Sequence, residues 1–424
     1  MGKLKRLRDN SPDITTADPK SYFADGAVSI YQKDVNSNGK LVAADGDKVY
    51  LYIGMRRGGR FAYALDVSDP DVPKFLWKIN NGMTGFEELG QTWSTLRVAK
   101  IRAVTGDPVV IMGAGYDPEN EDTIPATTNN KGRGIFVVNG RTGALVKHIM
   151  PAGMGSVPGD LAVVDRDGDG NFDRIYATDT KGNVWRTDIN DVDPANWTSY
   201  QLATLGGSGA NARKFLNKPD VVFGSSFDTI LVGSGDREHP FENAVVNRFY
   251  MLKDSNIGLT GGLLCKTLAA DPYRSCVESD LVDVTSNPYQ GTTATIPHGW
   301  YLTLGTGEKV VGNAISVAGT AFFGTNQPTP PAPGVCSSNL GMARLYAVGI
   351  EAGAARIDTN ADGVLTTADR SEEVKGGGFP PTPVYSPVCV DGKCGTPVCT
   401  GSHCINPGET GTSTKRSRTY WYKK

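Results

Sequence analysis

The chain has 424 residues, with 43 Lys and Arg against 45 Asp and Glu, so its formal net charge at pH 7 is only −2. This balance, without a long basic stripe, argues against nucleic acid as a principal partner. No run of apolar residues is long enough to span a membrane, so no transmembrane segment is expected. The 52 Gly and 25 Pro predict a loop-rich fold in which strands dominate, and therefore an all-β protein.

One strand pattern recurs along the chain. An apolar strand ends in Gly or Thr, a turn follows, and a second strand begins with aromatic or aliphatic residues and ends in a polar one. The pairs are 49–54 with 63–67, 109–113 with 135–139, 174–178 with 183–188, 229–233 with 248–252, and 321–324 with 344–348. Repeats spaced by roughly 50 to 95 residues predict the blades of a β-propeller. A sandwich of unrelated hairpins is the alternative, but it would not need the repeated order.

The whole chain, 1–424, is predicted to form a single propeller domain. Three segments interrupt the repeat and are predicted to be loop insertions, at about 255–298, about 326–340 and about 353–415. Insertions of this kind lie on blade loops, where binding functions concentrate.

Two short motifs in the first repeat could be binding sites, but a structural or solvated role without a ligand is favoured for both. Residues 34–39 (Asp-Val-Asn-Ser-Asn-Gly) begin like a calcium loop but hold one carboxylate. Because Asn-Gly is also the commonest hairpin turn signal, a plain turn is predicted there. Residues 56–60 (Arg-Arg-Gly-Gly-Arg) could bind an anion, but arginines in a Gly-rich turn are more often solvated.

Residues 165–173 read Asp-Arg-Asp-Gly-Asp-Gly-Asn-Phe-Asp. Four like charges so close together repel one another unless a cation gathers them, and oxygen-only ligands suit a hard ion. The spacing copies the first nine positions of a calcium loop, with an acidic solvated turn as the alternative. The predicted cofactor is Ca²⁺, and its predicted ligands are the side chains of Asp165, Asp167, Asp169 and Asp173, with Asn171 offering its carbonyl.

Residues 233–240 (Gly-Ser-Gly-Asp-Arg-Glu-His-Pro) bring an acid, a base and an imidazole together. They could form a general acid–base set. A turn at the end of a blade, in which Asp and Arg lock neighbouring loops, is favoured. The chain has only four His, and it contains no G-x-S-x-G elbow, Walker A loop or H-E-x-x-H motif. No catalytic residues are therefore predicted.

Residues 358–369 fit a twelve-residue calcium loop at its ligand positions and at the turn glycine, Gly363. The last position holds Asp in place of Glu, which is typical of dockerin-type loops. The predicted ligands are the side chains of Asp358, Asn360, Asp362, Thr366 and Asp369 and the carbonyl of Val364.

The cysteines indicate the compartment. Four of the seven, at 389, 394, 399 and 404, lie in a stretch rich in Pro, Gly, Ser and Thr, and Cys265 and Cys276 form another close pair. Such positions favour disulfides in an oxidising compartment, with a Cys₄ zinc site as the alternative for the last four. Cys336 has no assigned partner. Residues 1–9 are charged and have no apolar core behind them, so they are not a signal peptide. A fragment of a secreted protein is favoured over a cytoplasmic one.

Several blocks of sequence are too particular to be generic. They are 52–60 running into 63–70 and 73–77, then 132–138, the acidic loop 165–173, 233–240, 299–303 through 308–309, and 420–422. In this order they resemble the PilC/PilY family of type IV pilus tip proteins. The similarity runs from about residue 22 to the carboxyl end, apart from the insertions.

The resemblance implies a carboxyl-terminal β-propeller of modified, quinoprotein-like type, with calcium held by Asp165, Asp167, Asp169, Asp173 and the carbonyl of Asn171. It implies a protein that supports pilus assembly, controls retraction and adheres to surfaces. The expected partners are minor pilins of the pilus tip complex and a host or abiotic surface. The expected location is extracellular, at the pilus tip or outer-membrane surface. Family members usually carry a signal peptide and at least one earlier blade, so a propeller without its first blade is one expectation.

A quinoprotein (PQQ-type) dehydrogenase is the alternative from another class, because the Tyr-Ala-Leu-Asp strand also suits that propeller. Such enzymes hold calcium and quinone together in the central funnel. Here calcium is expected on a peripheral blade turn, and no adjacent cysteine pair is present to cap a quinone. A non-enzymatic binding and assembly module is therefore predicted.

Overall fold

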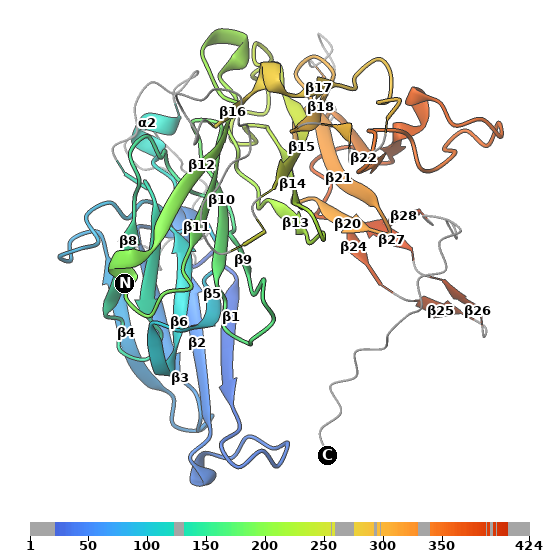
Figure 1. Ribbon diagram of the computed structural model, residues 1–424. Helices are drawn as coiled ribbons and strands as arrows, with labels where there is room; N and C mark the ends of the chain where they lie inside the picture. The colour runs from blue at the N-terminus through green and yellow to red at the C-terminus, as the bar shows by residue number, and fades with distance from the viewer. Residues whose placement is uncertain are drawn as a thin grey trace, which may run out of the picture.

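Five mainly antiparallel sheets follow one another along the chain in a curved row (Figure 1). The computed structural model describes residues 22–122, 131–255, 257–258, 275–291, 295–296, 298–329, 340–386 and 397–405, and the backbone of two short strands between 388 and 395. In these ranges, no helix has both the length and the apolar character needed to cross a membrane.

Each sheet is a blade built from consecutive strands. Blade 1 contains β1 (Val28–Lys33), β2 (Lys48–Gly54), β3 (Phe61–Asp66) and β4 (Lys74–Asn80). Blade 2 contains β5 (Arg97–Ile101), β6 (Val104–Gly113), β7 (Ile135–Asn139) and β8 (Leu145–Ile149). Blade 3 contains β9 (Ala162–Val164), β10 (Arg174–Thr178), β11 (Asn183–Asp188) and β12 (Thr198–Thr204), and β16 (Cys276–Val277) pairs in parallel with β12.

The remaining blades carry the longer excursions. Blade 4 contains β13 (Asp220–Val222), β14 (Asp228–Gly233), β15 (Arg248–Asp254) and β18 (Gly299–Thr303), and β17 (Val282–Asp283) pairs in parallel with β18. In blade 5, β19 (Lys309–Val310) and β20 (Ile315–Val317) both pair with β21 (Thr320–Gln327), which is followed by β22 (Met342–Gly349) and β23 (Ser371–Val374).

Two small sheets follow blade 5. They are β24 (Val384–Tyr385) with β27 (Val398–Thr400) and β28 (His403–Ile405), and the hairpin of β25 (Val388–Val390) and β26 (Lys393–Gly395). Helix in the described ranges is limited to α2 (Pro118–Glu121) and the 3₁₀ segments η1 (Ala43–Asp45), η2 (Arg56–Gly58), η3 (Pro194–Asn196), η4 (Gly209–Asn211), η5 (Glu278–Asp280) and η7 (Thr367–Arg370).

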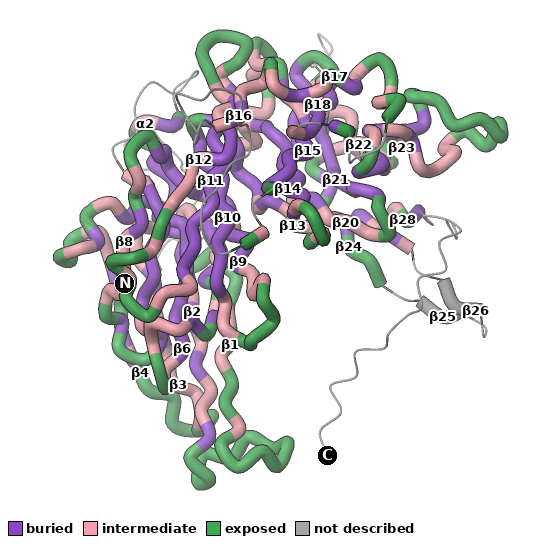
Figure 2. The backbone as a smooth tube through the Cα atoms, viewed as in Figure 1, coloured by how far each residue is buried: buried purple, intermediate pink, exposed green. Residues whose placement is uncertain are grey.

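Apolar side chains pack in one layer between each pair of neighbouring blades. Tyr52 and Trp77 of blade 1 meet Phe136 of blade 2, and Ile111 of blade 2 lies in the same layer as Trp185 of blade 3. Further layers join blades 3 and 4, blades 4 and 5, and blade 5 with the sheet of β24, β27 and β28. Figure 2 shows the buried stretches along the strands of all five blades. Buried apolar area contributes roughly 25 cal/mol per Å², so these layers hold the blades together.

The burial patterns explain why both alternating and continuous apolar strands occur. In β2 every second residue from Tyr50 to Gly54 is buried, as expected for a strand with one face against a neighbour. Strands β10 and β11 are buried along their whole length because blades lie on both of their faces. All five predicted strand pairs are confirmed, as β2–β3, β6–β7, β10–β11, β14–β15 and β21–β22.

The segments predicted to be insertions contain blade strands as well as loops. Strand β23 lies inside the segment 353–415 and is the last strand of blade 5. Strands β16 and β17, from the segment 255–298, add to blades 3 and 4. Most of 326–340 lies outside the described residues.

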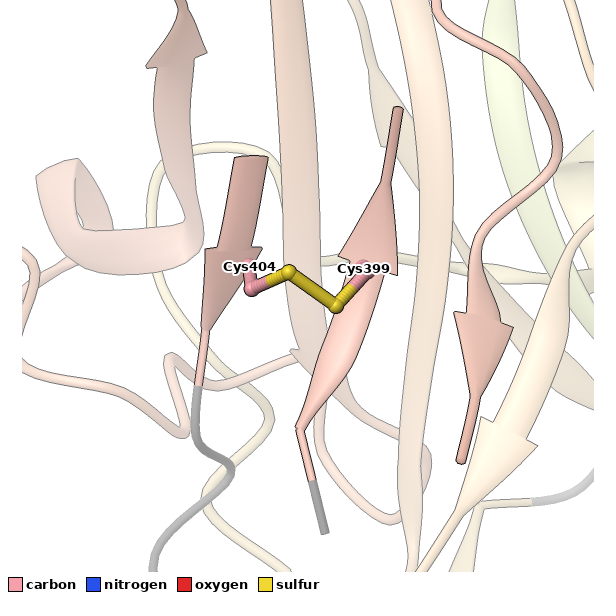
Figure 3. The surroundings of a disulfide bond; sticks show 2 residues. All are labelled: Cys399 and Cys404. Carbon is pink, nitrogen blue, oxygen red and sulfur yellow. A yellow bond between two sulfur atoms is a disulfide. The ribbon is translucent and has the colours of Figure 1, made fainter. Parts of the chain in front are cut away.

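The cysteine prediction is confirmed for one pair. Cys399 and Cys404 face each other across β27 and β28 and form a disulfide (Figure 3). Cys276 is buried and disulfide-bonded. Oxidised cysteines have no thiolate left to bind zinc, so the Cys₄ zinc alternative is wrong for residues 399 and 404. Cys265, Cys336 and the side chains of residues 389 and 394 lie outside the described residues.

The turn at 233–240 also has its predicted role. Asp236 pairs with Lys214 (3.0 Å) and with His239 (2.8 Å), and Glu238 pairs with Arg57 of blade 1. Arg237 donates from Nη1 to the carbonyl of Val311 at 3.0 Å. The segment therefore locks neighbouring loops together.

The loops that lead into β1, β5, β9, β13, β20 and β24, together with the β2–β3 and β14–β15 connections, line one cavity of 260 Å³. We call it the central pocket, and the residues used below are Arg56, Asp160, Arg237 and Phe379. Because all five blades and the segment before β24 contribute to its wall, the sheets are arranged around this point.

His148 of blade 2 is expected to make the stability of the fold depend on pH. His148 stacks on Phe136, with ring centroids 4.3 Å apart, and its Nε2 donates to the carbonyl of Arg133 at 2.9 Å. Burial lowers the pKa of His148, so the unfolded chain takes up a proton at a higher pH than the folded one. Stability is therefore expected to fall as the pH drops below about 6.5, by up to about 1.4 kcal/mol per pH unit. Urea unfolding at pH 7.5 and 5.5 measures this, and an unchanged pH dependence in His148→Gln would contradict the assignment.

Candidate metal centre

The first acidic loop, residues 165–173, connects β9 and β10 of blade 3. Its backbone amides fold the loop around its own carboxylates: Gly168 and Gly170 donate to Asp165 (2.7 and 2.8 Å), and Asp169 donates to Asp167 (3.2 Å). Gly170 has φ 87°, a left-handed conformation that glycine adopts without strain. The loop therefore directs several oxygen atoms toward one point.

Three carboxylates meet there. One oxygen from each of Asp165, Asp167 and Asp173 lies within 4.8 Å of the other two. Among the described residues, this is the one group of three or more His, Cys, Asp or Glu side chains placed so closely. Oxygen ligands at this spacing suit a hard divalent cation such as Ca²⁺.

Asp173 gives the strongest indication that this loop binds a cation. Its side chain is 1% exposed, and its Oδ2 accepts hydrogen bonds from the amides of Arg166 (2.9 Å) and Asp167 (3.2 Å). Its Oδ1 is buried and has no hydrogen-bond partner. Burial raises the pKa of Asp173, because the charged form loses water. A buried carboxylate oxygen without a partner is costly, and a bound cation would satisfy it.

Asp169 and Asn171 are placed differently. The Asp169 carboxylate accepts a bond from Arg102 Nη2 at 2.7 Å and from the backbone amide and side-chain amide of Asn171 (2.7 and 3.2 Å). The hydrogen bond from Arg102 is the main reason why the pKa of Asp169 falls to about 2. The same Arg102 nitrogen lies 2.9 Å from Asp167. A guanidinium from blade 2 therefore neutralises part of the acidic loop.

The loop is also tied to both neighbouring blades through its backbone and its non-acidic residues. The amide of Phe172 donates to the carbonyl of Lys100 in blade 2 at 2.8 Å. On the other side, Arg166 donates from Nε to both oxygens of the buried Asp228 in blade 4 (3.1 and 2.9 Å). The first acidic loop thus connects three blades.

The second acidic loop, residues 358–369, lies between β22 and β23 of blade 5. Gly363 donates to Asp358 at 2.8 Å, Val364 donates to Asp362 at 2.8 Å, and Asp362 donates to Asn360 at 3.0 Å. The Asp358 Oδ1 is buried and unpartnered. The Asp369 carboxylate instead accepts bonds from Thr366 and Thr359, and the Thr366 amide is the main reason why its pKa falls to about 2. This loop therefore does not gather its carboxylates as the first one does.

Comparisons with known proteins identify relatives of this chain. A family model described as the PilY1 beta-propeller domain matches residues 16–207, which include the first acidic loop. A type IV pilus biogenesis factor PilY1 homolog from Xylella fastidiosa is 24% identical over 350 residues, covering 72% of this chain and 22% of that protein. The type IV pilus biogenesis factor PilY1 from Pseudomonas aeruginosa is 31% identical over 148 residues, covering 33% of this chain and 12% of that protein.

The fold agrees as well. The crystal structure of the C-terminal domain of P. aeruginosa PilY1 matches with a TM-score of 0.62 at 19% identity, covering 93% of this chain and 88% of that chain. The resemblance to the PilC/PilY family expected from the sequence is thereby confirmed. The predicted β-propeller is confirmed as well. The chain spans less than a quarter of the length of the curated PilY1 relatives described above.

A third loop of the propeller, between β1 and β2, differs from the plain Asn-Gly turn predicted from the sequence. Strands β1 and β2 are in register from Lys33 opposite Lys48, so residues 34–47 form a long connection and not a two-residue turn. Gly39 donates to Asp34 at 2.7 Å, as Gly170 does to Asp165. The period-two pattern of Asn side chains indicated a calcium-type loop conformation, which the Asn-Gly dipeptide obscured.

Arg102 could not be found from the sequence, because it lies in the turn between β5 and β6 and no motif marks it. Its positive charge beside Asp167 and Asp169 should oppose a divalent cation. We expect Arg102→Gln to bind calcium more tightly, by up to about tenfold at low ionic strength, and the gain to shrink as salt screens the charge. Calcium titration of both forms measures this, with Arg141→Gln as the control. Weaker binding by Arg102→Gln would contradict it.

Proposed function

We propose that this chain is the calcium-binding propeller of a type IV pilus biogenesis factor, and that it acts as a binding and assembly module without enzymatic activity. The observation that carries the calcium assignment is the unpartnered, buried Oδ1 of Asp173 beside the carboxylates of Asp165 and Asp167. The relatives named as type IV pilus biogenesis factors support the pilus assignment. The ligands proposed for the first loop remain Asp165, Asp167, Asp169, Asp173 and the carbonyl of Asn171, and a second ion is proposed for residues 358–369.

Calcium would act on the fold through charge. The clustered carboxylates of the first loop repel one another, and a bound cation neutralises them. Because Phe172 contacts blade 2 and Arg166 pairs with Asp228 of blade 4, an ordered loop should also hold these two blades in place against blade 3. A ligand that binds only the folded state stabilises it by mass action. Docking of pilus partners to these blades would then depend on calcium.

We propose minor pilins of the pilus tip complex as the partners, and a host or abiotic surface as the adhesive target. The protein would then act outside the cell, at the pilus tip or outer-membrane surface, and calcium occupancy would influence whether pili extend or retract. The disulfide between Cys399 and Cys404 supports an oxidising location.

The position of the first loop also favours a binding module over a quinoprotein dehydrogenase. Such an enzyme needs calcium and quinone in one central site. No residue of the loop 165–173 lines the central pocket. Dye-linked alcohol oxidation by the purified chain, with calcium and added pyrroloquinoline quinone, tests the alternative. Turnover above the quinone-only control would overturn the non-enzymatic proposal.

The pilus assignment is tested in cells that make the natural protein from its own gene. Strains carrying Asp165→Ala are compared with strains carrying Asp71→Ala, which changes an exposed side chain in blade 1. Surface pili, twitching motility and attachment are measured at equal protein levels. We expect the Asp165 variant alone to change pilus number or retraction. Wild-type pili and attachment in an Asp165 variant that no longer binds calcium would refute the regulatory role.

A further inference from the structure

The central pocket brings together two arginines from distant parts of the propeller. Arg56 lies in the connection between β2 and β3, and Arg237 lies in the connection between β14 and β15. Within the described part of the chain, neither forms an ion pair with a carboxylate, although nearby arginines do. Arg57 pairs with Glu238, and Arg60 pairs with Asp117 at 3.2 Å. The two pocket arginines therefore differ from Arg57 and Arg60, which are each paired with a carboxylate.

Arg237 is held in place by two groups that carry no negative charge. Its Nη1 donates to the carbonyl of Val311 at 3.0 Å, and its guanidinium lies 5.4 Å from the centre of the Phe379 ring. Burial, with the charges of Arg56 and Arg57, lowers the pKa of Arg237 against the opposing charge of Glu238. An anion in the pocket would reverse this unfavourable effect.

Arg56 occupies a strained backbone position. Its φ is 47°, in the left-handed region that residues with a side chain rarely adopt and that costs about 1–2 kcal/mol. The strain is maintained by Thr92, whose carbonyl accepts the Arg56 amide at 3.0 Å and whose hydroxyl accepts the Met55 amide at 2.8 Å. Strained residues of this kind cluster at binding sites, where the surrounding structure keeps them in the unfavourable conformation.

The pocket wall has an excess of positive charge. Besides the two arginines it contains one acidic side chain, Asp160, whose Oδ1 accepts the amide of Thr95 at 2.6 Å. Two positive groups against one negative group leave a formal charge of +1 in a cavity of 260 Å³. This volume is at or below the lower end of ligand pockets, about 300–1,000 Å³, so it suits a small group and not a large cofactor.

We propose that the central pocket is a binding site for a carboxylate group, held by the guanidinium groups of Arg56 and Arg237. Guanidinium and carboxylate groups match in shape and form charge-assisted hydrogen bonds. The carboxylate belongs either to a small organic acid or to the carboxyl end of a peptide that enters the pocket. This site is independent of the acidic loops and would remain if the calcium proposal failed.

Ligand-observed NMR on the calcium-saturated chain tests the proposal with propionate and its neutral analogue propionamide. Propionate should bind saturably, and propionamide at least tenfold more weakly. Two variants remove one guanidinium each: Arg56→Gly, which suits the left-handed backbone, and Arg237→Gln. Each should weaken propionate binding at least tenfold, whereas Arg141→Gln, an exposed arginine paired with Asp107, should change it less than twofold.

A second arm distinguishes the two sources of the carboxylate. Triglycine with a free carboxyl end, compared with triglycine amide, should bind more tightly than propionate if a peptide end is the natural ligand, and no more tightly if a small acid is. Melting curves identify any variant that fails to fold, and Arg56→Gly then decides alone. Absence of saturable binding by both carboxylates, equal binding of the neutral analogues, or unchanged binding in a folded Arg56→Gly variant would overturn the proposal.

Discussion

Replacement of Asp173 by Asn is expected to remove most of the stabilisation that calcium gives to the folded chain. The carboxylate has one buried oxygen without a partner, and it lies beside Asp165 and Asp167. At a hundredfold excess of calcium over its dissociation constant, one site stabilises the folded state by about 2.7 kcal/mol. The variant should lose most of this gain, measured as the difference in melting temperature between calcium and EDTA.

The same variant should behave differently without calcium. Asn removes a buried negative charge from a group of like charges, so the melting temperature in EDTA should stay the same or rise. Asp71→Asn is the control, because Asp71 is exposed, and it should keep the full response to calcium. A variant that is less stable in EDTA but still gains the full calcium increment would show that Asp173 is structural and does not bind the ion.

Replacement of Arg186 by Ala is expected to destabilise the interface between blades 3 and 4 more than any surface change. Arg186 is fully buried in β11 and donates to Asp188 (2.9 and 2.6 Å) and to both oxygens of Asp254 at 3.1 Å. Burial alone would lower the pKa of Arg186, but the hydrogen bonds to Asp188 and the charge of Asp254 raise it above its usual value. Removing one member of such a buried group costs about 3–5 kcal/mol.

Urea unfolding measures the loss, and Arg141→Ala is the matched control. Arg141 forms one ion pair with Asp107, at 2.8 Å, and its side chain is 53% exposed. Exposed pairs contribute about 0–1 kcal/mol, so the control should remain close to wild type. Equal losses in both variants would mean that the buried ionic group does not hold the two blades together.

The blades were predictable because each strand pair repeats a local pattern. Alternation in strands such as β2, and continuous apolar runs in β10 and β11, follow directly from whether one or both faces meet a neighbouring blade. The clustering of carboxylates in the first acidic loop was equally predictable, since these residues are close in sequence and their spacing is set by the backbone of a single turn. In both cases the sequence pattern that predicts the structure is contained in a few neighbouring residues.

Contacts between blades could not be predicted in this way. Arg102 reaches the first acidic loop from blade 2, and Arg166 reaches Asp228 in blade 4, 62 residues further along the chain. Nothing in the local sequence distinguishes these arginines from solvated ones. Arg56 is similar: in the sequence it belongs to a Gly-rich basic turn, and only the arrangement of the blades brings it to the same pocket as Arg237. Pairing across the propeller depends on the fold as a whole.

The central claim is that the loop 165–173 binds calcium, and titration calorimetry on the metal-free chain tests it most directly. Calcium is added to the wild type, to Asp165→Asn and to Asp358→Asn, so that each acidic loop is removed in turn. We predict that Asp165→Asn abolishes one binding event and leaves any event at 358–369 intact, whereas Asp358→Asn does the reverse. A calcium isotherm of Asp165→Asn that is indistinguishable from that of the wild type would contradict the account.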